Sequence, residues 1–328
     1  MIRINHRCFI LRACSAALLW LGSASLLAQP YPAKPVRVIV PFGAGGATDI
    51  MARVMAARWQ EVFGQRFVVE NRTGANGNIG AEYVARSPAD GYTLLVLDLG
   101  SFTSGPAVTP NLPFDPATDF TPVTLLIGSP YGLAVTPSLP VKNVAELLAW
   151  AKANPGRFNY ATLGEGSTSH LAGLELAARA GTSFTFVSYK GGAQVLTEVA
   201  AGQAQALGLA MLSTYPFVQG GKLKLLAVMS RDRLAILPEV PTVAESGHPG
   251  FVAGQWQAVY APKGLPPEIA ERIRAESARF LNAPETRKRF ADQGAEVMPG
   301  SGEALAAFVA SERAKFTRLV KEHKIKVE

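Results

Sequence analysis

Short apolar stretches alternate along the chain with longer segments in which apolar residues recur every three or four positions. The short stretches predict buried strands, and the longer periodic segments predict helices. We therefore predict strands at 36–40, 66–71, 93–99, 120–127, 132–137, 158–162, 184–189, 205–210, 222–230, 255–262 and 296–299. Predicted helices cover 50–63, 79–86, 143–156, 169–180, 193–202, 266–292 and 302–322. Strands this apolar, separated by helices, indicate an α/β fold with parallel-rich sheets flanked by helices.

The order of these elements also predicts how the chain divides. About 300 residues exceed what one hydrophobic core usually organises, so we expect two lobes. The strand–helix alternation ends after 255–262, and we expect the two long helical stretches that follow to pack back onto a lobe already formed. The prediction is a discontinuous first lobe, 29–128 and 254–328, with a second lobe at 129–253 inserted into it.

The first 28 residues follow a different pattern. Three arginines precede an apolar run at 17–28, and the segment contains no acidic residue. This run is too short to span a bilayer and is typical of a secretory signal peptide. We expect cleavage near Ala28, with the Ser23–Ser25 pair as the alternative position and an uncleaved anchor as the other interpretation. Later apolar runs do not reach membrane-spanning length.

Removal of this segment changes the composition of the chain. Cys8 and Cys14 both lie in it, so the remaining chain has no disulfide, Cys nucleophile or thiolate metal site. The net charge falls from +7 to +4, and the basic residues are scattered. A nucleic-acid partner requires clustered basic charge, so we expect none. The modest positive charge suits anionic small molecules.

Candidate binding residues lie in glycine-rich turns between a predicted strand and a predicted helix. The first turn, PFGAGGATD at 41–49, lacks the Lys of a Walker loop, and Thr48 replaces the last glycine of a dinucleotide fingerprint. Asp49 would repel a phosphate. Backbone N–H groups at a helix start suit a small carboxylate, with an amine or a water beside Asp49. The alternative is that Thr48 and Asp49 only cap the helix.

Two further turns repeat this arrangement. YATLGEGSTSHLAGLEL at 160–176 places Gly164, Gly166 and the hydroxyls of 167–169 before a helix, and YKGGAQ at 189–194 is the third turn. In open α/β sheets, such turns lie at the carboxyl ends of the strands, where ligands bind. Turns from both lobes would then face one cleft.

Catalytic chemistry has little support in the sequence. Ser167 or Ser169 beside His170 suggests a secreted hydrolase, but GEGST is not the G-x-S-x-G elbow. No HExxH motif or carboxylate cluster accompanies these residues. For His170 a catalytic role, a role in ligand binding and a packing role at the helix start all remain open. We expect a protein that is not an enzyme and has no cofactor or metal site, and the hydrolase is the rival hypothesis.

Several blocks carry a resemblance to a known family: YPAKPVRVIVPFGAGGATDIMAR, VVENRTGANGNIGAEYVARSPADGYTLLV, PFDPATDFTPVT, STSHLAGLEL and PEVPTVAESG. They resemble receptors of the tripartite tricarboxylate transporter family, also called the Bug family. The resemblance implies a monomeric, two-lobed periplasmic binding protein (type II-like) with a ligand cleft between the lobes. It also implies that the protein binds a small carboxylate and delivers it to the membrane permease of a tripartite tricarboxylate-type transporter, or as a variant reports it to a membrane kinase. Closure by hinge motion is expected near 127–131 and 251–256.

Within the family, the first turn and its counterpart in the other lobe hold a carboxylate through backbone N–H groups and water, which implies Phe42–Asp49 and Gly164–His170 here. This sequence departs from the family at Gly43 and Ala44, which replace two prolines, and at 97–108, which contains Asp98 and Phe102. Leu209 and Ala210 stand where an Asp-Asn pair is usual. That replacement favours an unaminated carboxylate, with its apolar or aromatic end near Phe102, Tyr131 or Met211. The predicted ligand-binding residues are Phe42, Gly43, Gly46, Ala47, Thr48, Asp49, Gly100, Ser101, Phe102, Tyr131, Gly164, Ser167, Thr168, Ser169, His170, Leu209 and Met211.

Overall fold

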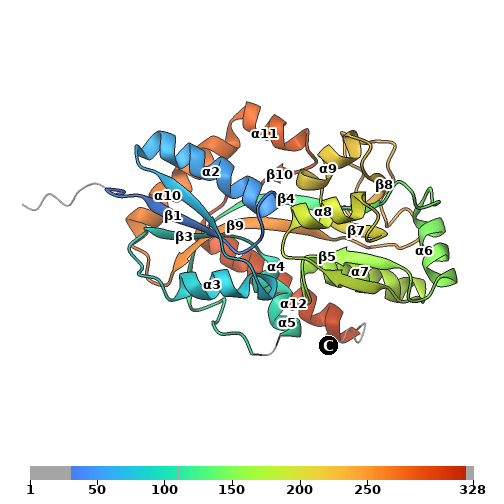
Figure 1. Cartoon of the computed structure of the whole chain (residues 1–328). Helices are drawn as coiled ribbons and strands as arrows, with labels where there is room; N and C mark the ends of the chain where they lie inside the picture. Colours follow the sequence, from blue (N-terminus) through green and yellow to red (C-terminus); the bar gives the residue numbers. More distant parts are fainter. Residues whose placement is uncertain (1–30, 110, 323–328) are drawn as a thin grey trace, which may run out of the picture. The chain divides into compact units, whose positions relative to one another are not determined.

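The predicted strands form one mixed sheet with helices packed against it in the computed structural model, which describes residues 31–109 and 111–322 (Figure 1). The strands are β1 (Val36–Val40), β2 (Phe67–Asn71), β3 (Thr93–Asp98), β4 (Phe120–Val135), β5 (Asn159–Thr162), β6 (Thr185–Ser188), β7 (Ala206–Ala210), β8 (Lys224–Val228), β9 (Gly254–Pro262) and β10 (Glu296–Val297). The helices are α2 (Ala47–Phe63), α3 (Asn78–Ala85), α4 (Gly100–Thr103), α5 (Gly105–Val108), α6 (Val144–Ala153), α7 (Thr168–Ala180), α8 (Gly192–Ala200), α9 (Met211–Gln219), α10 (Pro267–Asn282), α11 (Pro284–Ala291) and α12 (Gly302–Glu322), with a 3₁₀ turn, η1, at Ala75–Gly77.

The sheet has two parts with different partners around β4. Its order is β2-β1-β3-β9-β4-β7-β5-β6, and β8 and β10 also pair with β4. β1 is parallel to β2 and β3, and β5 is parallel to β6 and β7, whereas β4 is antiparallel to each of its partners. We call β1, β2, β3, β9, β10 and residues 120–130 the first sheet half, and β5 to β8 with residues 131–135 the second sheet half. The predicted α/β class is confirmed.

The strand β4 corrects the prediction of two separate strands at 120–127 and 132–137. It runs through Pro130 without a break. Pro130 is the last residue paired with β9, and Tyr131 is the first paired with β7. Because Pro130 lies where the ladder partner changes, its missing N–H interrupts neither ladder from within.

Each sheet half has its own apolar cluster. Ile39, Leu97 and Tyr260 belong to a buried cluster in the first half. Val195 and Leu207 belong to a separate buried cluster in the second half. Burial of apolar area at about 25 cal/mol per Å² is the main stabilising contribution of both clusters. The carboxyl ends of the parallel strands in each half carry the glycine-rich turns.

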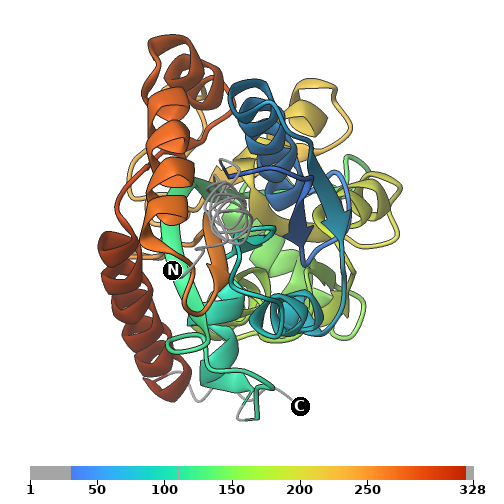
Figure 2. The same ribbon diagram turned by 90° about the vertical axis from the view of Figure 1, so that its left-hand side faces the viewer.

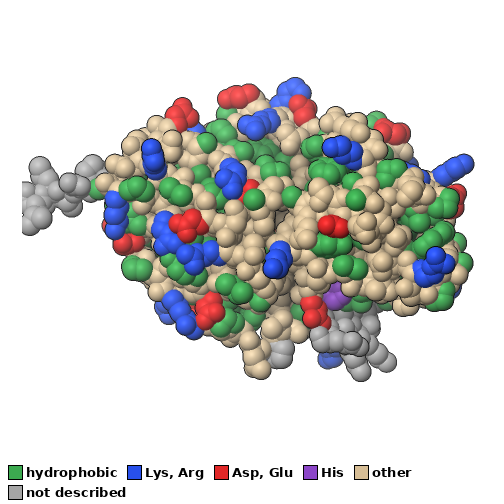
Figure 3. All heavy atoms as spheres, in the orientation of Figure 1, with side chains coloured by type: hydrophobic (Ala, Val, Ile, Leu, Met, Phe, Trp, Pro, Cys, Tyr) green, Lys and Arg blue, Asp and Glu red, His purple; other side chains and the backbone are tan. Residues whose placement is uncertain are grey.

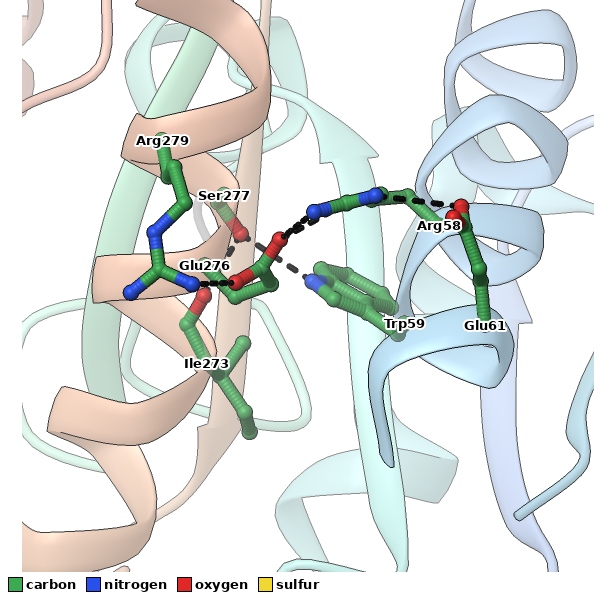
Figure 4. A network of polar contacts seen from close by, with 7 residues as sticks. All are labelled: Arg58, Trp59, Glu61, Ile273, Glu276, Ser277 and Arg279. Carbon is green, nitrogen blue, oxygen red and sulfur yellow. Dashed lines mark hydrogen bonds and ion pairs between the residues drawn. The ribbon is translucent and has the colours of Figure 1, made fainter. Parts of the chain in front are cut away.

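The C-terminal helices pack against the first sheet half. Figure 2 shows helices α10 and α12, coloured orange to red, along one side of these strands, and both contact β4. α10 is joined to α2 by the buried Glu276, which accepts hydrogen bonds from Arg58 at 2.7 Å and Arg279 at 2.9 Å (Figure 4). The indole Nε1 of Trp59 donates to Ser277 Oγ at 3.1 Å. This network joins α10, in the C-terminal segment, to α2, the helix that follows β1.

The helix predicted at 266–292 is two helices, which is a further correction. α10 ends at Asn282, Ala283 has the extended angles φ −60° and ψ 135°, and Pro284 begins α11. A proline disfavours helical angles in the residue before it and is tolerated in the first turn of a new helix. Pro284 therefore separates the two helices.

Two predictions, the lobe boundaries and the signal peptide, are not tested by the structure. The boundaries at 128/129 and 253/254 stay predictions, because the chain from Lys34 onward forms one compact unit. The predicted signal peptide and its cleavage near Ala28 lie outside the described residues. Within the ranges that the structure describes, no helix is both long and apolar enough to cross a membrane.

Candidate functional site

The first glycine-rich turn joins β1 to α2 and leaves the helix start open to an external acceptor. Gly46 is the N-cap of α2 and makes no side-chain capping bond. Gly45 has φ 79°, in the left-handed region that favours glycine. Thr48 is buried and its Oγ1 accepts a hydrogen bond from Gln255 Nε2 at 3.2 Å. The expectation that Thr48 caps the helix therefore does not describe this turn.

Hydrogen bonds to the carboxylate of Asp49 stabilise this first glycine-rich turn. Its Oδ2 accepts from Gly45 N–H at 2.9 Å and Arg53 Nε at 2.8 Å, and its Oδ1 accepts from Asn71 Nδ2 at 2.9 Å. Burial alone would raise the pKa of Asp49, but these hydrogen bonds and the Arg53 charge outweigh it and lower the pKa. Both carboxylate oxygens are thus occupied within the turn, and Asp49 lines neither cavity described below.

The second turn joins β5 to α7 and is bonded to itself. Gly164 has φ 118°, which a side chain would disfavour. Ser167 is the N-cap of α7, and its Oγ accepts from His170 N–H at 3.2 Å. Ser169 Oγ accepts from Leu163 N–H at 3.0 Å. These hydroxyls satisfy backbone groups of the turn, which is the role of helix-capping side chains.

The side chain of His170 also forms a hydrogen bond within this turn. Gly166 N–H donates to its Nδ1 at 3.1 Å, which places the ring proton on Nε2. Burial lowers the pKa of His170 to about 4, so the ring is neutral near pH 7. A hydrolytic Ser–His pair requires the hydroxyl to donate to an imidazole nitrogen. Instead, Ser167 Oγ donates to the carbonyl of Gly164 at 2.6 Å, so these residues have the geometry of a packed helix start.

Turns from the two sheet halves touch through glycines. Gly43 N–H donates to the carbonyl of Lys190, in the β6–α8 turn, at 3.0 Å. A Cβ added at Gly191 would lie 2.7 Å from Gly43 Cα, and one at Gly46 would lie 3.2 Å from the nitrogen of Gly192. We call these contacts among Gly43, Gly46, Gly191 and Gly192 the glycine clasp. Only glycine permits backbones to approach this closely.

A small inner cavity lies against the clasp. Its volume is about 10 Å³, room for about one water molecule. Phe42 and residues 46–48 line one side, and Gly192, Leu209 and Ser213 line the other. α8, like α2, begins at a glycine N-cap, Gly191, without a side-chain capping bond. Two helix N-termini without side-chain caps therefore converge on one cavity.

An outer cavity of about 620 Å³ shares Phe42 and Leu163 with the inner one. Residues 74–78, 163–165 and 188–190 line it, so both sheet halves contribute. This volume is within the usual range for small-molecule sites. Two further cavities, of about 460 and 610 Å³, contain none of the predicted site residues.

The remaining predicted residues lie outside the two cavities. Thr168 Oγ1 and Tyr131 OH share a hydrogen bond of 2.5 Å, and Gly100 lies beside Thr168. Phe102 lines neither cavity: it packs in the first apolar cluster, with ring centroids 5.0 Å from Tyr260. The other predicted residues are placed as follows: Ser101 Oγ donates to the carbonyl of Asn76, and Met211 is fully buried, with its Sδ facing Gly132 of β4.

Several lining residues were not predicted. Gln255 lines the inner cavity from β9, and the two glutamines of this buried strand were a signal in the sequence. Gly192 and Lys190 belong to the third glycine-rich turn, which the sequence did indicate. Asn76 lies in the segment TGANGN and has φ 51°, a left-handed angle that only the tertiary structure reveals.

Charge and metal chemistry add little to this site. On the face shown in Figure 3, Lys and Arg side chains are interspersed with Asp and Glu. In the described part of the chain, no group of three or more His, Cys, Asp or Glu side chains is placed to hold a metal ion. The inner cavity is lined by backbone groups, hydroxyls, one amide and apolar side chains, whereas Glu165 and Lys190 add charged groups to the outer cavity.

Comparisons with known proteins identify the relatives of this chain. Residues 51–325 match the family model described as tripartite tricarboxylate transporter family receptor. Protein BugT of Bordetella pertussis is 36% identical over 301 residues, which cover 92% of each chain. The solved structure of R. palustris Rpa4515 with adipate has a TM-score of 0.88 and 37% identity, covering 90% of this chain and 99% of that one. MatC (Rpa3494) from Rhodopseudomonas palustris with bound malate has a TM-score of 0.84 and 32% identity, covering 88% and 100%.

Proposed function

Because the chain belongs to the tripartite tricarboxylate transporter receptor family, we propose that it captures a small carboxylate between its two sheet halves and delivers it to a membrane permease. The family consists of periplasmic solute-binding receptors and is not an enzyme family. Two related receptors have been solved with adipate and with malate. A carboxylate ligand for this chain agrees with both.

The observation that carries the proposal is the convergence of α2 and α8 on the inner cavity. Each helix begins at a glycine N-cap without a side-chain capping bond. The first N–H groups of a helix lack partners within the helix, and the helix dipole makes this end positive. A carboxylate is the acceptor that suits two such ends, and it needs no cationic side chain.

Closure of the site over the ligand follows from its size. The inner cavity, at about 10 Å³, holds about one water molecule, which is less than a carboxylate requires. The ligand therefore enters when the turns of the glycine clasp separate. We place the hinge at 127–131 and 251–256, where β4 and β9 run between the sheet halves.

Thermal unfolding of the protein against a pH-matched panel of carboxylates tests the proposal. The panel contains di- and tricarboxylates, amino acids, and aromatic and pyridine carboxylates. A ligand at 1,000 times its Kd adds about 4 kcal/mol to the free energy of unfolding, a shift of several degrees in Tm. We expect at least one carboxylate to raise Tm and to be recovered unchanged. A ligand that is consumed would support the hydrolase instead.

The variant Thr48→Ala tests the place of binding. Thr48 lines the inner cavity, and its hydroxyl positions Gln255. We expect its removal to weaken carboxylate binding about tenfold, the effect of one hydrogen bond worth about 1.4 kcal/mol. Thr197→Ala, on the exposed face of α8, is the matched control. Equal affinities in both variants would place the ligand elsewhere.

Delivery to a permease is tested in cells. Deleting the gene is expected to abolish uptake of the carboxylate found in the panel, and restoring it should recover uptake. Uptake that persists, together with loss of a transcriptional response to the same carboxylate, would favour a receptor that reports to a membrane kinase.

A further inference from the structure

A buried carboxyl group without a cationic partner lies at the end of β3. Asp98 is 2% exposed, and its Oδ1 accepts from the N–H of Gly100 at 3.1 Å. Among the described residues it forms no ion pair with Lys, Arg or His. Burying a carboxylate without a partner is costly, so a residue of this kind in the middle of a sheet requires an explanation.

The side chain opposite Asp98 is also without a partner. Gln257 is the residue paired with Asp98 in the antiparallel β3–β9 ladder, so both side chains leave the same face of the sheet. Gln257 is fully buried, and in the described chain neither its Nε2 nor its Oε1 has a hydrogen-bond partner. An unpaired buried amide costs about 1–3 kcal/mol per group. Beside Asp98, whose carboxyl group accepts from backbone N–H groups only, Gln257 thus offers one acceptor and one donor that are both unused.

The second sheet half closes over this pair. A Cβ added at Gly100 would lie 3.4 Å from Asp98 Oδ2 and 3.3 Å from Thr168 Oγ1, so the start of α7 lies next to Asp98. Thr168 in turn bonds Tyr131 OH at 2.5 Å. Burial and then the Asp98 charge raise the pKa of Tyr131, which also places Asp98 near that hydroxyl. The cluster therefore lies between the sheet halves.

The cluster lies two residues along β9 from the inner cavity. Gln255, which lines that cavity, precedes Gln257 by two residues on β9. Residues two apart on a strand leave the same face about 7 Å from each other. Asp98 and Gln257 line neither cavity in this structure, so a ligand with one carboxylate at the helix starts reaches them only when the sheet halves separate.

We propose that Asp98, supported by Gln257, determines the ligand specificity of the cleft by accepting a hydrogen bond from a hydroxyl or ammonium group on the ligand. This inference rests on the proposed function and narrows its ligand class to carboxylates that carry such a donor. A plain methylene chain leaves the polar pair unsatisfied, and above about pH 7, where Asp98 is ionised, a second carboxylate placed here meets a like charge. A site with buried polar groups rejects analogues that lack the matching group.

Three four-carbon acids that differ in one group test the inference: succinate, malate with a hydroxyl, and aspartate with an ammonium. Affinities are measured by titration calorimetry with the whole protein. We expect malate or aspartate to bind at least about tenfold more tightly than succinate. Asp98→Ala should remove that preference while leaving succinate affinity within about twofold.

The variant Asp98→Asn distinguishes a hydroxyl donor on the ligand from an ammonium donor. It also supplies a second measurement if Asp98→Ala does not fold. Asn keeps an acceptor oxygen but not the negative charge. A hydroxyl donor predicts that malate retains part of its preference in Asp98→Asn, whereas an ammonium donor predicts that the preference for aspartate is lost. Asp292→Asn, on the exposed end of α11, is the matched control and should change no ratio.

Other outcomes overturn the inference. Succinate that binds as tightly as both other acids, or ratios unchanged in either Asp98 variant, would exclude Asp98 from specificity while the proposed function stands. Binding of adipate without binding of any of the three acids would do the same, because adipate brings no donor to Asp98. Failure of every carboxylate in the panel would overturn the proposed function and this inference together.

Discussion

At the scale of single residues, the hydrogen-bond and charge partners of a buried carboxyl group help to determine whether its pKa rises or falls. Asp49 and Asp98 are each 2% exposed, although Asp98 lies deeper in the protein. Hydrogen bonds from Arg53 and the turn outweigh the effect of burial and lower the pKa of Asp49. Asp98 has only backbone N–H donors, so burial prevails and raises its pKa to about 7. Asp49 therefore holds a turn together, and Asp98 remains available to a ligand.

The raised pKa of Asp98 predicts how stability depends on pH. Between about pH 4 and pH 7, the folded protein keeps a proton on Asp98 that the unfolded chain releases. Raising the pH through this window therefore lowers the free energy of unfolding, by up to about 4 kcal/mol at 1.36 kcal/mol per pKa unit. The destabilisation is absent below pH 4 and complete above pH 7.

Urea unfolding of the wild type and Asp98→Asn at several pH values checks this prediction. The variant should gain stability relative to the wild type as the pH rises from 4 to 7. The difference between the two proteins removes the contribution of His170, whose lowered pKa acts in the opposite direction. Parallel curves would contradict the prediction.

At the scale of elements, the helix starts differ in how they are satisfied. α7 is capped by Ser167, whereas α2 and α8 begin at glycines without side-chain caps. The glycine clasp brings these two helix starts to one cavity. The bond from Gly43 N–H to the carbonyl of Lys190 requires a residue other than proline at position 43, because proline has no N–H.

The glycine clasp predicts that Gly191→Ala weakens ligand binding. Gly191 has an extended φ of −176°, so alanine is not strained there, but its Cβ would lie 2.7 Å from Gly43 Cα. The turns must then move apart, at a cost of about 1–3 kcal/mol for overpacking. We expect carboxylate affinity to fall about five- to 150-fold.

Calorimetric titration with the carboxylate found in the panel measures this effect. Gly300→Ala is the control, because its added Cβ makes only an ordinary contact of 3.7 Å with Ala304. A Gly191→Ala variant with unchanged affinity would show that closure does not bring the two turns into contact.

At the scale of the whole molecule, the C-terminal segment is part of the first sheet half although it is remote in sequence. Glu276 joins α10 to Arg58 of α2 across 218 residues (Figure 4). Trp59 adds a buried bond to Ser277. Because these contacts lie away from both cavities, they affect stability without contacting the ligand.

Glu276→Ala is therefore expected to lower stability and leave carboxylate affinity unchanged. Glu276 is 4% exposed, and its removal takes away the partner of Arg279 and one of the two carboxylate partners of Arg58, which keeps Glu61. Because both arginines are partly solvated, we expect a loss of about 1–3 kcal/mol rather than the larger cost of a fully buried pair. Thermal unfolding measures this loss, and Glu271→Ala on the exposed side of α10 is the control. Equal Tm values for the two variants would be evidence against the network.

Much of the local structure was predictable from the sequence. VRVIV is β1 to the residue, and α7 begins one residue before the predicted start. The misses include β4, which continues through Pro130, the single helix predicted at 266–292, and α9, which was not predicted because it follows β7 directly and contains Pro216. The periodicity of apolar residues indicates which side of a segment is buried. It does not indicate that a strand continues past a proline because a different strand pairs with it from that point on.

The sequence by itself determined the α/β class, the family and the glycine-rich turns, because each depends on a local pattern of residues. Only the tertiary structure decided which turns meet. It brought the α2 and α8 turns together at the inner cavity, which Leu163 of the β5–α7 turn also lines, and it buried Phe102 and Met211 in packed interiors. It also set Gln257 opposite Asp98. These contacts depend on sheet order and register, which join residues far apart in the chain and leave no local pattern in the sequence.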